Sequence, residues 1–147
     1  MEDQFRILAL DLGVKSCGFA ISDHSRKISF PLEQFNFTRY DFEKVVQRVN
    51  FWLKEYQISL VVLGYPTTLS GKISPRTKMI EHFAKIFKKS CKIKLFLQDE
   101  RLSTKEAELF LLDSGLSFQK RKKIIDKMAA QIILERYLHS QNGNKKH

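Results

Sequence analysis

The sequence predicts one α/β domain built on a mixed five-stranded sheet with helices on both faces. Three observations favour this fold: apolar segments with short connections at the start, a helical apolar stripe after them, and alternating strands and helices in the remainder. Short connections predict an antiparallel meander, whereas a strand that follows a helix becomes a parallel partner of the first strand by a right-handed crossover. With 147 residues, 43% of them hydrophobic, the chain can form one domain with a substantial core.

Five segments have the apolar pattern of strands. The first is apolar at nearly every position, which indicates burial on both faces of a sheet. A turn at Asp23-His24-Ser25 separates the second strand from the third. The predicted strands are residues 5–10, 18–22, part of 28–37, 60–63 and 93–97.

Four segments have helical signals. The first carries an apolar stripe at helical spacing. Ser74 and Pro75 form a start signal for the second, and Ser103 with Glu106 forms a capping box for the third. The predicted helices are residues 41–56, 75–89, 103–112 and 118–140. We therefore expect a single domain over residues 1–140 and a flexible basic tail over 141–147.

The charge is strongly positive and uneven. The chain has 26 Lys and Arg against 16 Asp and Glu, for a net charge of +10, and residues 74–147 hold 17 basic and 8 acidic side chains. A basic half on a folded domain predicts a polyanionic partner, either nucleic acid or an anionic membrane surface. A solvated lysine-rich surface without a ligand is the alternative.

Several classes are excluded by composition. The acidic start at Glu2-Asp3 is unlike a signal peptide, and no apolar stretch is long enough to span a bilayer. Cys17 and Cys91 stand far apart and outside any metal-binding pair, so we expect reduced core thiols in a cytoplasmic protein. The histidines show no zinc-ligand spacing.

Carboxylates follow two of the predicted strands. Asp11 ends the first strand, and Asp99 and Glu100 follow the last. Because the carboxyl ends of parallel strands open on one edge of a sheet, these acids are expected to face one crevice. Neighbours in an extended chain point to opposite faces, so only one of Asp99 and Glu100 can join Asp11, and the spacing leaves the choice open.

A third acid lies within the last predicted helix. Asp126 shares the packed face with Ala129 and Ala130, whose small side chains allow close approach to the sheet. An inward carboxylate is costly unless it pairs with a cation, here Lys122, Lys123 or Lys127, or binds a metal. Three converging carboxylates on a basic protein predict a site for Mg²⁺ or Mn²⁺ that cleaves phosphodiester bonds. The basic run that includes Lys122 and Lys123, beside Asp126, is a candidate substrate-binding surface.

Four short motifs follow one another along nearly the whole chain. They are residues 11–20 (DLGVKSCGFA), 62–66 (VLGYP) with Gly71 and Pro75-Arg76, 99–107 (DERLSTKEA) and 123–130 (KIIDKMAA). Together they resemble the motifs of the YqgF/RuvX family of ribonuclease H-like nucleases. The resemblance implies a ribonuclease H-like fold. It also implies that Asp11, Glu100 and Asp126 are the catalytic, metal-binding acids, which chooses Glu100 over Asp99 by analogy.

The resemblance further implies that Lys15, Arg76 and Arg101 contact phosphates. The family is associated with maturation of the 5′ end of 16S ribosomal RNA in the bacterial cytoplasm, which implies a ribosomal RNA precursor and the ribosome or its small subunit as partners. Thr68 and Ser70 stand where the family usually has Asn and Asp, so substrate contacts of that loop are expected to differ.

Two other functions remain open from the sequence, and a third is disfavoured by the length of the chain. A Holliday junction resolvase acting on branched DNA would need a symmetric dimer to cut two strands. A non-catalytic RNA-binding factor in ribosome assembly would have no use for three acids. An actin-like ATPase, which shares the Asp-x-Gly opening, would need two such domains, and 147 residues hold one.

Overall fold

A computed structural model describes residues 5–66, 74–99, 112 and 114–145 of the chain, and for residues 126–127 and 142–145 it describes the backbone alone. The described elements are β1 (Arg6–Leu12), β2 (Ser16–Ser22), β3 (Ser29–Asn36), α1 (Phe42–Glu55), β4 (Ile58–Tyr65), α2 (Pro75–Ser90), β5 (Lys94–Asp99) and α4 (Phe118–Lys145). Of the helix predicted over 103–112, all but residue 112 lies outside the described residues.

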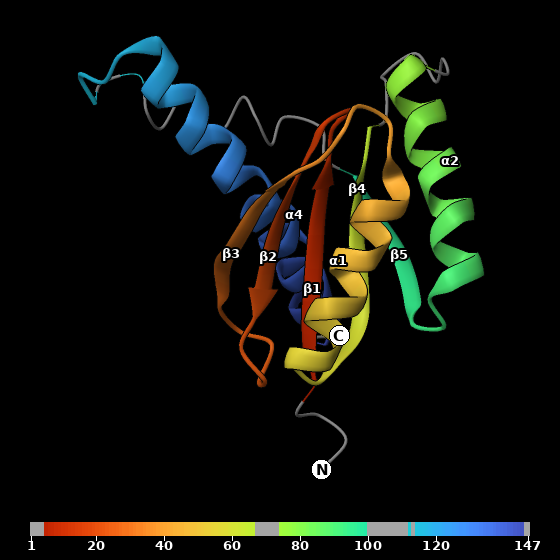
Figure 1. Cartoon of the computed structure of the whole chain (residues 1–147). Helices are drawn as coiled ribbons and strands as arrows, with labels where there is room; N and C mark the ends of the chain where they lie inside the picture. The colour runs from red at the N-terminus through yellow and green to blue at the C-terminus, as the bar shows by residue number, and fades with distance from the viewer. Residues whose placement is uncertain (1–4, 67–73, 100–111, 113, 146–147) are drawn as a thin grey trace.

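The five strands form one mixed sheet in the order β3-β2-β1-β4-β5 (Figure 1). The strands of the meander, β1 to β3, are antiparallel, while β4 and β5 run parallel to β1. The predicted α/β fold and mixed five-stranded sheet are therefore confirmed. The parallel strands β1, β4 and β5 end at the same edge of the sheet.

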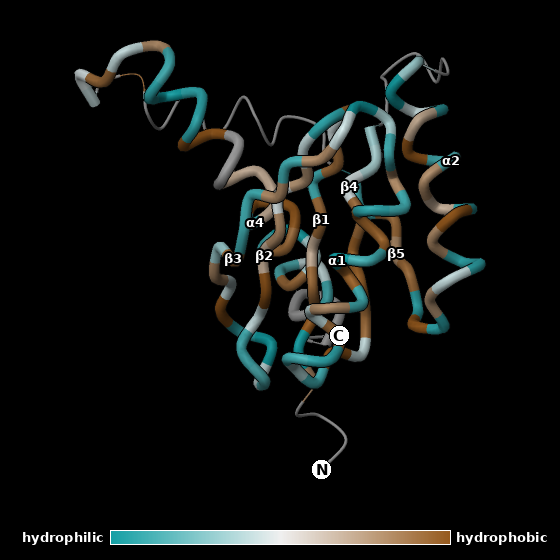
Figure 2. Tube along the Cα trace, viewed as in Figure 1, coloured by the Kyte–Doolittle hydropathy of each residue, from teal (hydrophilic) through white to brown (hydrophobic). Residues whose placement is uncertain are grey.

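Helices cover both faces of the sheet, and the central strand β1 is buried between them. Leu8 and Leu10 belong to the cluster that α1 and α2 cover, whereas Ile7 and Ala9 pack against α4. Figure 2 shows hydrophobic residues along β1, between the layers of helices. The continuous apolar pattern of β1 is thus explained by burial on both faces.

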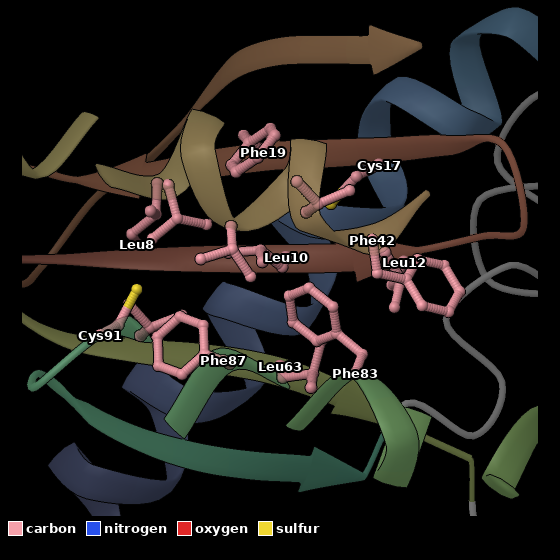
Figure 3. Close-up of a cluster of buried hydrophobic side chains, with 14 of the residues drawn as sticks. Leu8, Leu10, Leu12, Cys17, Phe19, Phe42, Leu63, Phe83, Phe87 and Cys91 are labelled. Carbon is pink, nitrogen blue, oxygen red and sulfur yellow. The ribbon is translucent and has the colours of Figure 1, made fainter. Parts of the chain in front are cut away.

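The larger core lies between the sheet and the helices α1 and α2. Figure 3 shows Phe83 and Phe87 of α2 beside Leu10 of β1 and Leu63 of β4, all fully buried. In α1 the buried residues are Phe42, Val45, Val46 and Val49, the apolar stripe that predicted the helix.

The start of α2 follows its sequence signal. The Ser74 hydroxyl oxygen accepts a hydrogen bond of 3.1 Å from the Thr77 backbone N–H, and Pro75 occupies the first turn. Pro has no N–H to leave unpaired there, so the cap and the proline together define where the helix begins.

The opposite face is covered by α4. Its residues Ala130, Ile133, Leu134 and Leu138 pack on the sheet, while its N-terminal end projects past the carboxyl end of β1 (upper left in Figure 1). The backbone of α4 is helical as far as Lys145, five residues beyond the predicted end at Ser140. Residues 141–145 of the predicted tail are therefore part of the helix.

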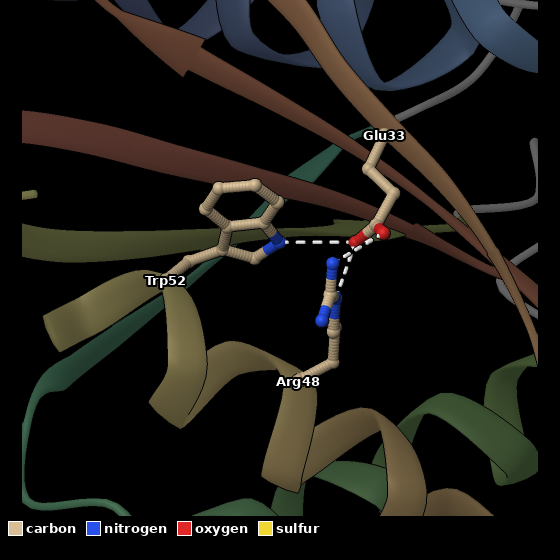
Figure 4. Close-up of polar contacts among 3 residues, drawn as sticks. All are labelled: Glu33, Arg48 and Trp52. Carbon is tan, nitrogen blue, oxygen red and sulfur yellow. Dashed lines mark hydrogen bonds and ion pairs between the residues drawn. The ribbon is translucent and has the colours of Figure 1, made fainter. Parts of the chain in front are cut away.

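The carboxylate of Glu33 links the edge strand β3 to α1. Arg48 donates to the two Glu33 oxygens at 2.7 and 2.6 Å, and the Trp52 indole N–H donates to Oε1 at 3.1 Å (Figure 4). The Arg48 guanidinium also lies 4.3 Å from the centroid of the Phe51 ring. Bidentate pairing with a further donor makes this contact stronger than an ordinary surface ion pair.

The turn between β2 and β3 is closed by Asp23. Its carboxylate accepts backbone N–H bonds from Lys27 at 2.8 Å and Ile28 at 3.0 Å, and a bond from the Ser25 hydroxyl. Partial burial raises the pKa of this carboxyl, but these three hydrogen bonds and one from the backbone N–H of Asp23 itself outweigh it and lower the pKa from 3.8 to about 2.

Replacing Glu33 by Ala should lower the free energy of unfolding by about 1–2 kcal/mol, because Arg48 and Trp52 lose their shared acceptor. Urea unfolding followed by Trp52 fluorescence measures this. The control is Glu55→Ala, which removes an exposed carboxylate from α1, the helix that carries Arg48 and Trp52. It should change the free energy of unfolding by less than about 0.5 kcal/mol. Equal stability of the two variants would show that the Glu33 contact contributes nothing.

The free energy of unfolding should also decrease in acid, because Asp23 becomes protonated. Because its folded pKa lies below the unfolded value, the charged carboxylate contributes stability above pH 3.8 that is lost as the pH drops through about 2. Urea unfolding of the wild type and of Asp23→Asn from pH 5 to pH 2 checks this. The stability difference between them should shrink across that interval, and a constant difference would contradict the assignment.

Candidate functional site

The candidate site lies at the edge where β1, β4 and β5 end. Asp11 stands within β1 rather than at its end, because β1 continues to Leu12 and pairs Asp11 with Gly18 and Leu12 with Cys17 of β2. The predicted end at residue 10 was therefore two residues short. Glycine at position 18 leaves no side chain beside Asp11 on β2.

The side chain of Asp11 is on the face of the sheet that α4 covers. Leu10 and Leu12 belong to the core cluster under α1 and α2, and Asp11 alternates with them, sharing its face with Ala9. The side chain is 24% exposed. The carboxylate is therefore half-buried but still open to a ligand at the edge of the sheet.

Arg76 joins Asp11 from the opposite face. It is the second residue of α2, and its Nη2 atom donates to Asp11 Oδ1 at 3.2 Å. The Ser74 cap sets where α2 begins, which places Arg76 in the first turn of the helix, within reach of the acid. The sequence placed Arg76 at the site but did not predict this ion pair.

The choice between Asp99 and Glu100 is narrowed by strand register. Asp99 pairs with Tyr65, which packs on the cluster beneath α1 and α2. Asp99 is therefore on the face of the sheet opposite Asp11. Glu100 and Arg101 lie outside the described residues, as do Thr68 and Ser70.

Asp126 lies in α4, three and four residues before the buried Ala129 and Ala130. Ala130 belongs to the same cluster as Ala9 of β1 and Ala20 of β2, so each of the three elements contributes a small residue to the layer between α4 and the sheet. This contact brings the backbone of α4 close to the strand that carries Asp11.

The predicted lysines are exposed: Lys15 in the turn between β1 and β2, and Lys122 and Lys123 on α4. Within the described side chains, no group of three His, Cys, Asp or Glu residues is close enough to hold a metal ion. Of the three predicted metal ligands, Asp11 is the one whose side chain is described, so this finding does not bear on Glu100 or Asp126.

Cys17 of β2 pairs with Leu12 of β1 and is buried in the cluster beneath α1 and α2. Its pKa is raised by full burial and by the negative charges of Asp11 and Glu33, with Arg76 acting weakly in the opposite direction. Burial also raises the pKa of Cys91. Both cysteines are free and buried, as expected for reduced core thiols.

A groove beside Arg76 was not predicted by any pattern in the sequence. A cavity of about 420 Å³ opens between the start of α2 and the segment that joins β3 to α1, and Tyr40 forms one of its walls. Tyr40 stands in no motif, and its exposure depends on the path of that loop, so no pattern in the sequence could identify it.

Among the described residues, every helix is too short or too polar to span a lipid bilayer.

Two solved structures share the fold. Thermus thermophilus RuvC in complex with a Holliday junction superposes with a TM-score of 0.57 at 11% identity, covering 95% of this chain and 96% of that one. The fowlpox virus Holliday junction resolvase has a TM-score of 0.53 at 20% identity, covering 92% and 99%. These similarities confirm the ribonuclease H-like fold.

Sequence relatives cover almost the whole chain. A protein of Mesomycoplasma hyopneumoniae named "Putative pre-16S rRNA nuclease" is 67% identical over 138 residues, which are 94% of this chain and 96% of the relative. Proteins of the same name from Mycoplasmopsis pulmonis and Bacillus subtilis are 41% and 39% identical, over 97% and 93% of this chain and 99% of each relative. The RuvX family, described as "Holliday junction resolvase", matches residues 5–140. The chain belongs to the RuvX family.

Proposed function

We propose that this chain hydrolyses phosphodiester bonds in the precursor of 16S ribosomal RNA, with divalent metal held by Asp11, Glu100 and Asp126. Membership of the RuvX family makes it a nuclease, a hydrolase of phosphodiester bonds. The metal requirement and the substrate are the proposal. The observation that carries it is the half-buried Asp11 carboxylate at the carboxyl edge of the sheet, paired with Arg76.

The residues fit a hard divalent cation. Asp11 supplies carboxylate oxygen, the donor that Mg²⁺ and Mn²⁺ prefer, and a quarter of its side chain is open to a hydrated ion. The register that turns Asp99 away favours Glu100, the next residue, as the second acid. The close approach of α4 to β1 favours Asp126 as the third. When bound, the metal would activate water and stabilise the leaving oxygen.

The chain's own cations would position the substrate. Arg76 holds the Asp11 carboxylate in place and offsets its repulsion of a phosphate. Lys15 stands exposed in the adjacent turn, and Lys122 and Lys123 extend the positive surface along α4. Arg101 completes the proposed phosphate contacts.

The substrate proposal rests on the relatives. Three curated relatives, up to 67% identical, share the name of a pre-16S ribosomal RNA nuclease, which favours ribosomal RNA, the small ribosomal subunit as partner and the cytoplasm as location. The description of the family favours branched DNA as the second candidate. Cleavage of both substrates side by side decides between them.

Asp11→Asn should reduce cleavage of pre-16S RNA in Mg²⁺ or Mn²⁺ by about 100-fold or more, the scale of losing one charge-stabilising group in an active site. RNA binding should be kept or should tighten, because one negative charge near the phosphates is removed. Gel analysis of labelled RNA and fluorescence anisotropy measure the two quantities. Asp23→Asn, the same substitution at the far end of β2, is the control. Undiminished cleavage by Asp11→Asn would refute the catalytic role.

Replacing Lys122 and Lys123 together by Gln should weaken RNA binding and flatten its salt dependence. Each lost phosphate contact should reduce the slope of log K against log salt by roughly 0.7 on single-stranded RNA. The matched control replaces Lys88 and Lys89 by Gln; both are exposed in the last turn of α2, far along that helix from Arg76. If both double variants bind alike, Lys122 and Lys123 do not contact the substrate.

A further inference from the structure

We propose that the groove between Tyr40 and α2 binds one unpaired nucleotide of the substrate strand, with its base stacked on the Tyr40 ring. The site rests on the nuclease function proposed above and specifies it further. A substrate strand would then be recognised where it is single-stranded, beside the phosphate that is cleaved.

Tyr40 is an exposed aromatic residue in a fixed position. Its relative exposure is 56%, and its backbone has a φ of 64°, which a residue other than glycine rarely adopts. The Tyr40 N–H donates to the Val14 carbonyl oxygen at 2.7 Å, and its own carbonyl accepts the Phe42 N–H at 2.9 Å. The strained conformation is therefore held from both sides, as is common at functional sites.

The ring itself is also supported. It meets the buried Phe42 ring edge to face, with the centroids 6.1 Å apart and an interplanar angle of 84°. The Arg39 guanidinium lies 5.1 Å from the Tyr40 ring centroid. A preorganised ring beside a cation is the arrangement that single-stranded nucleic acid uses for stacking.

The groove offers both an apolar surface and positive charge. Its volume of about 420 Å³ falls within the range of small-ligand sites. Val14, Phe42 and Met79 supply apolar lining, and Arg76, Lys78 and His82 supply polar groups. This combination suits a nucleobase and its phosphate better than a purely apolar peptide segment.

The groove and the candidate catalytic edge share Arg76. Arg76 lines the groove and also donates to Asp11 at 3.2 Å, and Val14 follows Asp11 by three residues. A strand whose phosphate lies at Asp11 can therefore place a neighbouring base against Tyr40. Bases in a duplex are already stacked and paired, so the groove selects an unpaired nucleotide.

The test measures binding without cleavage. The full chain in EDTA is titrated into a short single-stranded RNA carrying 2-aminopurine, and into the same sequence as a duplex. We expect 2-aminopurine fluorescence to be quenched on binding the single strand. Tyr40→Ala should weaken single-strand affinity about 10-fold, within the measured range for loss of one stacked base. It should change duplex affinity by less than 2-fold.

Three further variants make the result interpretable. Tyr40→Phe keeps the aromatic face and should restore affinity and quenching. Tyr40→Leu fills the same space without an aromatic face and replaces Tyr40→Ala if that variant unfolds. Phe51→Ala removes another exposed ring with an arginine over it, on α1, and should leave RNA binding unchanged.

Two results would overturn the proposal that the groove binds a nucleotide. One is an unchanged affinity for single-stranded RNA in the folded Tyr40→Ala and Tyr40→Leu variants. The other is an equal loss of affinity for the single strand and the duplex. Tyr40-dependent binding of a poly-glutamate peptide, with no effect on RNA, would assign the groove to an acidic protein partner instead. Failure of the nuclease proposal would be seen separately, as absence of any Asp11-dependent cleavage, whatever the outcome at Tyr40.

Discussion

The architecture of the site depends on the close contact between α4 and the centre of the sheet. The two faces of β1 differ: Leu8, Leu10 and Leu12 fill the space beneath α1 and α2, while the other face carries Ala9 and then Asp11. Ala130 of α4 belongs to the same buried cluster as Ala9 and Ala20, and these small side chains let the helix lie near the strands. A larger side chain at this contact would lift α4 away from the strand that carries the acid.

Charge at the edge is balanced by residues from separate elements. Asp11 comes from β1 and Arg76 from the start of α2, and the Ser74 cap determines where that helix begins. The ion pair permits a half-buried carboxylate in the absence of a ligand, at a modest desolvation cost. The same arginine lines the Tyr40 groove, so one side chain connects the candidate catalytic acid with the proposed base-binding surface.

Local sequence signals predicted most of the fold, because each was strong on its own. The doubly apolar first strand, the Ser74-Pro75 helix start and the turn at Asp23 all have direct counterparts in the structure. Boundaries were less accurate: Asp11 and Leu12 are in β1 because β2 pairs with them, which depends on the neighbouring strand rather than on local composition. The Asp11–Arg76 pair and the exposed Tyr40 were missed because each is created by segments distant in the chain or by the path of a loop.

The central claim is that Asp11, Glu100 and Asp126 hold one divalent cation site. Calorimetric titration of the full chain with Mn²⁺ tests it without a substrate. We expect the wild type to bind Mn²⁺, and Asp11→Asn, Glu100→Gln and Asp126→Asn each to weaken that binding in the folded protein, while Asp23→Asn leaves it unchanged. A wild type that binds no Mn²⁺, or any one of the three variants binding as tightly as the wild type, would contradict the claim.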